Sequence, residues 1–443
     1  MTMPILLDPV ASDATPPKRT DVAVIGGGII GAATAYFLAE KGVSVLLCEK
    51  GEIGAEQSGR NWGWCRTMGR DLREMPLAQE SLRLWRGLSA RIGAETGFKQ
   101  TGTLYICPDA KTLAKREAWL AQAQAYNVSS RILRGTQVNE TLSGAAGQWA
   151  GALFTPDDGV AEPHMAAPAL AHAARRRGAS IMTNCAARSI DVSAGRVSGI
   201  VTEKGRVACS SVVLAGGVWS SLFCKSLNLR LPQLKVLASV LRTAPTDKGP
   251  GPAAWGPGLS LRKRLDGGYT VSHGSVIADI VPDSFRYFRD FLPLLRMEWS
   301  GIELRGGKSF FEEAGYGRYW TKDAPSPFER RRVLDPAPSP HDLARARRNL
   351  EASFPAFKNV PTQASWGGLI DATPDILPVI SGAAGLPGFY ISTGYSGHGF
   401  GIGPGAGLLT AQMVTGEKPV VDPEPFRFSR FSDGSDVRPR TGL

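Results

Sequence analysis

The chain has 443 residues, of which 43% are hydrophobic and 21% are charged, so it is long enough for two or three domains with buried cores. Its net charge of +11 would suit a nucleic-acid binder, but lysine and arginine are spread along the chain without interleaved aromatic residues. We therefore expect no nucleic-acid partner, and a positive charge that favours an anionic substrate. The sequence has no run of 18 apolar residues, so no transmembrane helix is predicted.

The first residues and the cysteines limit the class of protein further. Residues 1–20 contain four prolines and no long apolar segment, so we expect a disordered or extended leader and not a signal peptide. The six cysteines form no Cys-x-x-Cys pair, which argues against a zinc site or an iron–sulfur cluster. We expect reduced thiols, no metal and a cytoplasmic protein.

The first patterned segment predicts a strand, a turn, a helix and a second strand. Asp21–Ile25 is a short β-branched run, typical of a buried parallel strand. The glycine-rich turn at 26–31 follows it, and Ile29–Lys41 then has apolar residues at helical spacing before Gly42. Val43–Cys48 is a second apolar strand. The order and lengths are those of a βαβ unit.

The turn of this unit carries the Gly-x-Gly-x-x-Gly pattern in the context that dinucleotide binding requires. Gly26 permits the tight turn, Gly28 lets the backbone approach a pyrophosphate, and Gly31 allows close packing of helix on strand. Glu49 ends the second strand, where a carboxylate accepts hydrogen bonds from the ribose hydroxyls and disfavours NADP. These residues do not decide whether the cofactor is NAD or FAD. A second strand-to-glycine turn at 212–220, which could contact the same cofactor, favours FAD.

The remaining patterns predict alternating helices and strands. Helices are expected over Met75–Ile92, Glu162–Arg177, His341–Phe354 and Gly405–Thr415. Strands are expected over Thr101–Cys107, Gly151–Thr155, Ser180–Asn184, Arg188–Val192, Arg196–Glu203, Val207–Leu214, Leu234–Thr243, Gly268–His273 and Gly388–Ile391. The proline-rich stretches Ala253–Pro257 and Ala324–Pro340 are expected to lack regular structure.

Five segments carry a family resemblance. They are GGGIIGAATAYFLAEKG with VLLCEK (26–50), SGRNWGW (Ser58–Trp64), AGGVWS (Ala215–Ser220), GGLIDATPDILP (Gly367–Pro378) and GYSGHGFGIGPG (Gly394–Gly405). Together they resemble the D-amino-acid oxidase superfamily, in the branch of glycine oxidase, sarcosine oxidase and the bacterial hydroxyproline and opine dehydrogenases. Their order and spacing span nearly the whole chain and are more specific than any single segment.

This resemblance implies an α/β fold with an FAD-binding Rossmann-like domain and an inserted α+β substrate domain built on an antiparallel sheet. The FAD domain would be discontinuous, over residues 21–96, 151–230 and 351–430. The substrate domain would take residues 97–150 and 231–350, including an insert at 281–340 with no assigned role. The flavin would lie where the two domains meet.

Carried over by position, the resemblance also implies which residues bind FAD. Glu49 and Lys50 would flank the ribose, Ala187 would offer backbone groups to the adenine, and the turn at 397–400 would lie near the flavin. The full set of expected cofactor residues is Gly26, Gly28, Ile29, Ile30, Gly31, Glu49, Lys50, Ser58, Arg60, Asn61, Gly63, Trp64, Ala187, Ala215, Gly216, Trp219, Gly394, Tyr395, Ser396, Gly397, His398, Gly399 and Phe400.

The sequence departs from the sarcosine oxidases at two positions. Gln363–Trp366 lacks the cysteine that holds the flavin covalently in those enzymes, so we expect non-covalent FAD. Gly401 stands where they have a lysine that binds the substrate carboxylate. Carboxylate binding must then come from another residue, or the substrate differs.

The implied reaction is hydride transfer from the carbon next to nitrogen of an amine or amino acid to flavin N5, which gives an imine that hydrolyses. Arg66 matches an arginine near the flavin and would hold a carboxylate, with Arg70 as a second candidate. Tyr269 and His273 lie four residues apart on one expected strand. Because alternate strand residues share a face, we expect both side chains to point toward the substrate. His398 lies within the turn beside the flavin.

Several functions remain open on the sequence. The chain is expected to be an amine or amino-acid oxidase or dehydrogenase, with oxygen, a quinone or a partner subunit as electron acceptor. Alternatively, it is the flavin subunit of a hetero-oligomeric dehydrogenase of the opine or hydroxyproline type. An NAD-dependent reductase and a non-catalytic flavin-binding module are weaker alternatives. The identity and stereochemistry of the substrate are not predicted.

Overall fold

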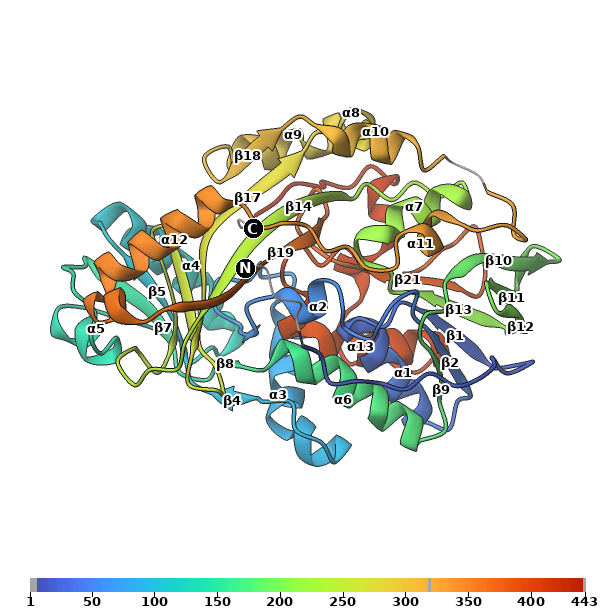
Figure 1. Cartoon of the computed structure of the whole chain (residues 1–443), viewed down its shortest axis with the longest axis horizontal. Helices are drawn as coiled ribbons and strands as arrows, with labels where there is room; N and C mark the ends of the chain where they lie inside the picture. The colour runs from blue at the N-terminus through green and yellow to red at the C-terminus, as the bar shows by residue number, and fades with distance from the viewer. Residues whose placement is uncertain (1–5, 318–319, 441–443) are drawn as a thin grey trace.

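A mainly parallel six-stranded sheet carries the glycine-rich turn (Figure 1). The structure is a computed structural model that describes residues 6–317 and 320–440. Its strands, in spatial order, are β20 (Val379–Gly382), β21 (Phe389–Thr393), β13 (Ser211–Leu214), β1 (Val22–Ile25), β2 (Val45–Cys48) and β9 (Ser180–Met182). Only β20 runs antiparallel to its neighbour among these strands.

Both faces of this sheet are covered, which explains why its strands are continuous apolar runs. Val22 and Val24 of β1 belong to one hydrophobic core, whereas Ala23 and Ile25 belong to the other. The first core is completed by α1 (Ile29–Glu40), α3 (Met75–Ile92), α6 (Pro163–Arg176) and α13 (Gly399–Thr415). The second core includes α7 (Ser220–Ser226) and the small antiparallel sheet of β10 (Ala187–Ser193), β11 (Arg196–Thr202) and β12 (Gly205–Ala208).

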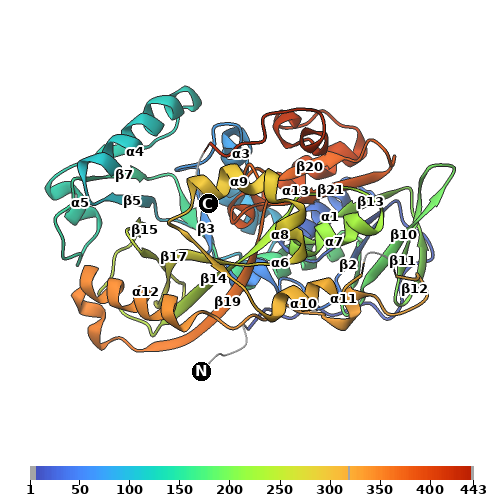
Figure 2. The ribbon, with the colours of Figure 1, turned by 90° about the horizontal axis from the view of Figure 1, so that it is seen from above.

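A larger sheet lies beside the first (Figure 2). Its path is β19 (Thr362–Ala372), β14 (Leu234–Thr243), β17 (Tyr269–Asp279), β16 (Leu259–Lys263), β15 (Ala253–Gly256), β5 (Thr103–Cys107), β7 (Gly151–Thr155) and β6 (Arg131–Leu133), with β18 (Ile302–Arg305) beside β17. Most neighbours pair antiparallel, and α12 (Pro340–Ser353) packs against β17. The architecture is therefore α/β with a second, largely antiparallel sheet, as expected.

The expected domain boundaries cut across the larger sheet. Gly151–Thr155 pairs with Thr103–Cys107, and Thr362–Ala372 pairs along its length with Leu234–Thr243. Both strands were assigned to the FAD domain, but their hydrogen-bond partners place them in the larger sheet. Sheet membership depends on partners far away in the sequence, which an apolar pattern does not identify.

The described part of the expected leader, residues 6–20, is extended and hydrogen-bonded rather than disordered. Asp13 N donates to the Ile181 carbonyl at 2.8 Å, and Thr20 N donates to the Ala208 carbonyl at 2.9 Å. These bonds attach the segment to β9 and β12. The first five residues of the leader lie outside the described residues.

Two local expectations also differ from the structure. Ala253–Gly256 forms a strand despite the prolines beside it, because it pairs with β5 and β16. The last helix begins at Gly399, six residues before the expected start at Gly405. A Cβ at Gly403 would lie 2.8 Å from the Ile29 side chain, and one at Gly407 would lie 2.4 Å from Ala33. The glycines therefore allow α13 to approach α1 closely, so they do not end the helix.

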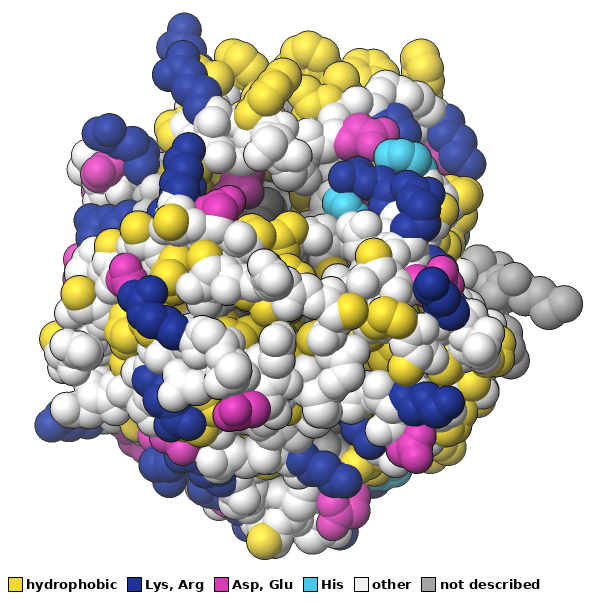
Figure 3. Space-filling view, turned by 90° about the vertical axis from the view of Figure 1, so that its left-hand side faces the viewer, with side chains coloured by type: hydrophobic (Ala, Val, Ile, Leu, Met, Phe, Trp, Pro, Cys, Tyr) yellow, Lys and Arg dark blue, Asp and Glu magenta, His cyan; other side chains and the backbone are white. Residues whose placement is uncertain are grey.

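Large hydrophobic side chains are exposed on the segment after β17. It contains α8 (Pro282–Arg286), α9 (Phe288–Met297), β18 and α10 (Lys308–Ala314). The exposed side chains are Phe285, Phe288, Met297, Trp299, Leu304 and Phe311. Figure 3 shows hydrophobic side chains gathered at the top of the molecule, over α9 and β18. No helix in the described ranges is both long enough and apolar enough to cross a membrane.

Candidate active site

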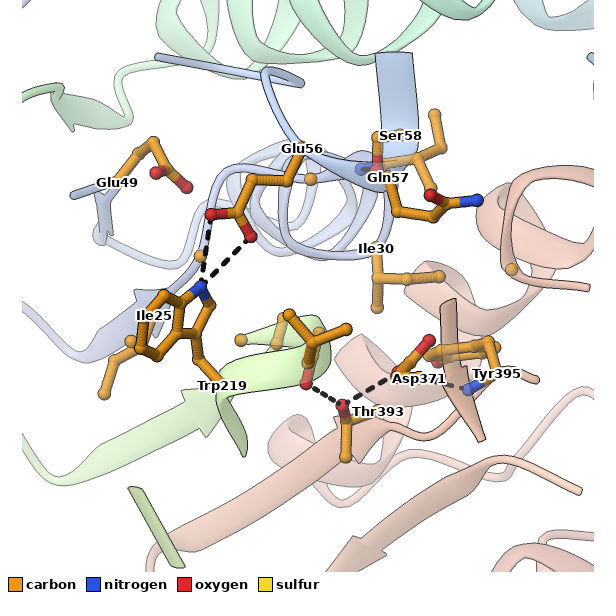
Figure 4. A pocket seen from close by; sticks show the side chains of 18 of the residues that line it. Ile25, Ile30, Glu49, Glu56, Gln57, Ser58, Trp219, Asp371, Thr393 and Tyr395 are labelled. Atoms are coloured by element: carbon orange, nitrogen blue, oxygen red, sulfur yellow. Dashed lines mark hydrogen bonds between the residues drawn. The ribbon is translucent and has the colours of Figure 1, made fainter. Parts of the chain in front are cut away.

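A cavity lies at the carboxyl ends of β1 and β13, where parallel sheets of this kind bind ligands (Figure 4). Gly26 ends β1 with a φ of +103°, and a Cβ there would lie 2.3 Å from the Ala215 carbonyl oxygen. A Cβ at Gly31 would lie 1.9 Å from the Gly26 carbonyl oxygen. Only glycine fits at these two positions, so the turn and the helix keep the close packing that a bound pyrophosphate needs.

The N-terminus of α1 faces this cavity and is held by Ser58. The Ile29 N–H donates to Ser58 Oγ at 2.9 Å, and a Cβ at Gly28 would lie 2.9 Å from the same oxygen. Gly28 and Ser58 both line the cavity together with Asn61. The free N–H groups and the helix dipole at this end favour a negatively charged group such as a phosphate.

The second strand delivers Glu49 to the cavity in a fixed position. Its two carboxylate oxygens accept from Gly27 N and Gly51 N, each at 2.7 Å. Each oxygen keeps further lone pairs, so both can also accept from ribose hydroxyls. The residues present therefore fit a dinucleotide whose adenosine end lies at β2.

Two carboxylates in this cavity were not predicted from the sequence. Glu56 accepts from Trp219 Nε1 at 3.1 and 3.2 Å (Figure 4). It also pairs with Lys50 at 2.6 Å. Asp371 accepts from Gly394 N at 2.7 Å, and burial raises the pKa of Asp371 to about 6. Asp371 lies within the family segment Gly367–Pro378, which was the one available signal for it.

A second cavity of about 350 Å³ continues from the first and is large enough for an amino acid. The two cavities share the lining residues Gln57, Asn61, Gly397 and Phe400. One wall consists of Trp62, Trp64 and Trp255, whose ring centroids lie 5.3 to 6.2 Å apart in edge-on contacts. Such a wall excludes water from whatever binds beside the first cavity.

Arg66 lies in the wall of this second cavity, against the rings of Trp64 and Tyr105. One guanidinium nitrogen donates to the Met68 carbonyl oxygen. The other N–H groups of Arg66 have no partner in the part of the chain that the structure describes. They are available to a carboxylate in the cavity, by the two parallel bonds that arginine favours.

Most of the expected cofactor residues come together around the first cavity. Its lining includes Gly26, Gly28, Ile29, Ile30, Glu49, Lys50, Ser58, Asn61, Ala187, Ala215, Gly216, Trp219, Tyr395, Gly397, Gly399 and Phe400. Arg60, Trp64, Ser396 and His398 line the second cavity instead. Gly31, Gly63 and Gly394 line neither, although a Cβ at each would lie within 2.5 Å of a neighbouring atom.

Arg60, expected beside the pyrophosphate or the flavin edge, lines the second cavity, and its guanidinium bonds neighbouring residues. It donates to Asp335 at 2.6 Å, to the Gly367 carbonyl at 3.0 Å and to the Ala55 carbonyl at 3.0 Å.

Close packing explains why position 401 is a glycine. A Cβ there would lie 2.7 Å from the Trp64 carbonyl oxygen, so this position has no room for the lysine of the sarcosine oxidases.

Tyr269, one of the two β17 residues expected to face the substrate, lines neither cavity. Tyr269 is fully buried in the core of the larger sheet, and its hydroxyl donates to the Pro250 carbonyl at 2.9 Å. His273 lines the second cavity. Both side chains lie on the side of β17 that α12 covers: Tyr269 belongs to one core with Leu350 of α12, and Ser275, which bonds His273 Nδ1, donates to Asp342 of α12. They share a face, but Tyr269 is buried within the core and does not reach the cavity.

Comparison with known proteins agrees with this geometry. A family model described as FAD dependent oxidoreductase matches residues 21–413. The structure of L-amino acid deaminase from Proteus myxofaciens in complex with anthranilate is 35% identical, with a TM-score of 0.94 over 96% of this chain and 97% of that one. L-amino acid deaminase from Proteus vulgaris is 33% identical, with a TM-score of 0.92 over 96% of this chain and 100% of that one.

Curated relatives are more distant. Sarcosine oxidase subunit beta from Rhizobium meliloti is 25% identical over 95% of this chain and 90% of its own length. Mitochondrial sarcosine dehydrogenase from Homo sapiens is 24% identical over 96% of this chain. The chain spans only 43% of that dehydrogenase, so it corresponds to less than half of that relative. The glycine-rich turn, the cavity at the strand ends and a family model that covers most of the chain lead to one conclusion: the chain belongs to the family of FAD-dependent oxidoreductases.

Proposed function

We propose that this protein oxidises the C–N bond of an amino acid or a secondary amine. The observation that carries the proposal is the second cavity, which joins the dinucleotide cavity and presents Arg66 and His398 beside an aromatic wall. When bound, FAD supplies the acceptor for a hydride, that is, one proton and two electrons from the substrate carbon. The resulting imine takes up water and releases ammonia or an amine.

The residues of the second cavity would bind and orient the substrate. Arg66 would hold the carboxylate, which fixes the reacting carbon relative to the first cavity. Arg66 and Arg70 together make the cavity positive, which lowers the pKa of a bound ammonium group and favours the free amine that reacts. Trp62, Trp64 and Trp255 would exclude water. Two similar structures are of L-amino acid deaminases, which supports an amino acid as substrate.

The direct test is anaerobic mixing of the purified flavoprotein with a panel of amino acids and N-alkyl amino acids. We expect at least one of them to bleach the flavin absorbance. We also expect acid denaturation to release the flavin, because the proposed FAD is non-covalent. A protein that stays yellow with every amine, or that contains no flavin, would contradict the proposal.

A second candidate is the flavin subunit of a hetero-oligomer. The match with this chain covers 90% and 93% of the lengths of two relatives named sarcosine oxidase subunit beta. Their names favour a subunit role. A subunit that passes electrons to a partner should regain its colour slowly when air is admitted, and faster with a quinone or a co-purified subunit. An oxidase should regain its colour rapidly in air alone.

Replacing Arg66 by methionine is expected to raise KM for the amino acid about ten- to hundred-fold. The reason is the loss of a hydrogen-bonded charge pair worth about 1.5–3 kcal/mol. Steady-state kinetics measure this, and flavin content should not change. Arg83→Met is the matched control, since Arg83 is exposed and pairs only with Glu80 among the described residues. Equal KM values for the two variants would remove Arg66 from the substrate site.

A further inference from the structure

Glu74 is a buried carboxylate beneath the second cavity. Its side chain has no exposed surface, and its Oε2 lies 3.2 Å from His398 Nδ1 and 3.7 Å from Arg70 Nη1. Arg70 and His398 line the cavity, whereas Glu74 lies behind them. A carboxylate this deep remains in a fold only when charged or polar partners compensate for the lost water, so Glu74 depends on these two residues.

The two nitrogens of the His398 ring have different surroundings. Nδ1 is buried 3.2 Å from Glu74 Oε2, which is within ion-pair distance. The two atoms are not aligned well enough to count as a hydrogen bond. Nε2 is not among the buried unpartnered atoms, and the described residues give it no hydrogen bond. The ring therefore contributes to the cavity lining through its Nε2 edge.

The charges around the ring define its protonation. Burial, with Arg70 and Arg66 nearby, lowers the pKa of His398 to about 4, although Glu74 acts in the opposite direction. Burial raises the pKa of the Glu74 carboxyl, but the charged Arg70 and the ring N–H of His398 act in the opposite direction and hold it below the ordinary value, so Glu74 is ionised. At neutral pH the ring is neutral, and an ionised carboxylate beside Nδ1 keeps the one ring proton on that nitrogen.

We propose that Glu74 is a positioning residue that holds His398 with its proton on Nδ1, so that Nε2 is presented to the cavity as a hydrogen-bond acceptor for the amino group of the substrate. This inference rests on the proposed function. Arg66 would hold the carboxylate and His398 the nitrogen, which fixes both ends of an amino acid beside the first cavity. A ring that is neutral at pH 7 accepts this bond without taking a proton.

The test is nitrogen-15 NMR of the histidine rings in the holoprotein, without turnover. The chain has five histidines, and the signal of His398 is assigned from the variant His398→Gln. We expect the wild-type His398 at pH 7 to be neutral with the proton on Nδ1. In Glu74→Gln the population with the proton on Nε2 should rise. A wild-type ring that is protonated, or that carries its proton on Nε2, overturns the proposal whether or not any variant folds.

Activity provides the second readout. Loss of a partner that orients a site residue typically costs about ten- to hundred-fold, so Glu74→Gln should lower kcat/KM by that factor. Glu80→Gln is the matched control, because Glu80 lies on α3, the helix that begins directly after Glu74, and outside both cavities. A drop in kcat/KM with an unchanged tautomer means that Glu74 is merely structural and overturns the proposal. Wild-type protein that no amine reduces contradicts the proposed function instead, and leaves the tautomer measurement intact.

Discussion

Replacing Arg262 by methionine is expected to destabilise the protein by about 3–5 kcal/mol, because it leaves a buried carboxylate without its partner. Arg262 lies on β16 and donates to both oxygens of Glu162 at 2.8 and 3.0 Å, with side-chain exposures of 1% and 2%. Its Nε donates to the Trp62 carbonyl at 2.5 Å, so the residue also holds the aromatic wall. Denaturant unfolding of the holoprotein, followed by circular dichroism, measures the loss.

The effect of Arg262→Met should depend on pH in a defined direction. Burial would raise the pKa of Glu162, but Arg262 overrides it and holds this pKa at about 2, below the ordinary 4.5. The contribution of the pair is therefore complete above about pH 4.5 and is lost as the pH falls toward 2. In the variant the unpaired carboxylate has a raised pKa, so the difference in unfolding free energy should be larger at pH 7 than at pH 4.

A surface pair provides the control for this variant. Arg83→Met breaks the ion pair with Glu80, in which the arginine side chain is 64% exposed, and should cost about 1 kcal/mol or less. If Arg262→Met costs no more than Arg83→Met at pH 7, the buried pair does not stabilise the junction between β16 and α6. Equal losses at pH 4 and pH 7 would contradict the assigned ionisation of Glu162.

The flavin half of the fold could be predicted because its signals are local. The turn after β1, the helix that follows and Glu49 lie within 29 residues of each other, from Asp21 to Glu49. Each has a steric or electrostatic reason that a sequence pattern expresses directly. Ser58 and Trp219 were predicted differently, from short glycine-containing segments that resemble the family.

The substrate half was harder to predict because its geometry depends on distant partners. Thr362–Ala372 joins the larger sheet only through its pairing with β14, and Tyr269 lies outside the cavity because it is buried in the core with Leu350 and Phe357. Glu74 gave no signal, since a single glutamate before a helix is usually exposed. Its role follows only from burial against His398, more than 300 residues away in the sequence.

Gly31→Ala is expected to weaken FAD binding more than hundred-fold, which corresponds to about 3 kcal/mol, the upper end of the usual cost of overpacking. The new Cβ would lie 1.9 Å from the Gly26 carbonyl oxygen and 3.1 Å from the Gly26 carbonyl carbon. These are backbone atoms, so no side chain can rotate away, and either the turn or the start of α1 must move. Both form the wall of the dinucleotide cavity. The ratio of flavin to protein absorbance in the purified variant measures the loss.

Gly87→Ala separates this steric effect from a general effect of glycine replacement. Gly87 lies within α3, and a Cβ there would meet no atom within 4 Å, so alanine should stabilise the helix by up to about 1 kcal/mol. We expect full flavin content in Gly87→Ala and little or none in Gly31→Ala. A folded Gly31→Ala protein with full flavin content would mean that the cofactor does not depend on the close contact between α1 and the turn, and the assignment of this cavity to FAD would then be wrong.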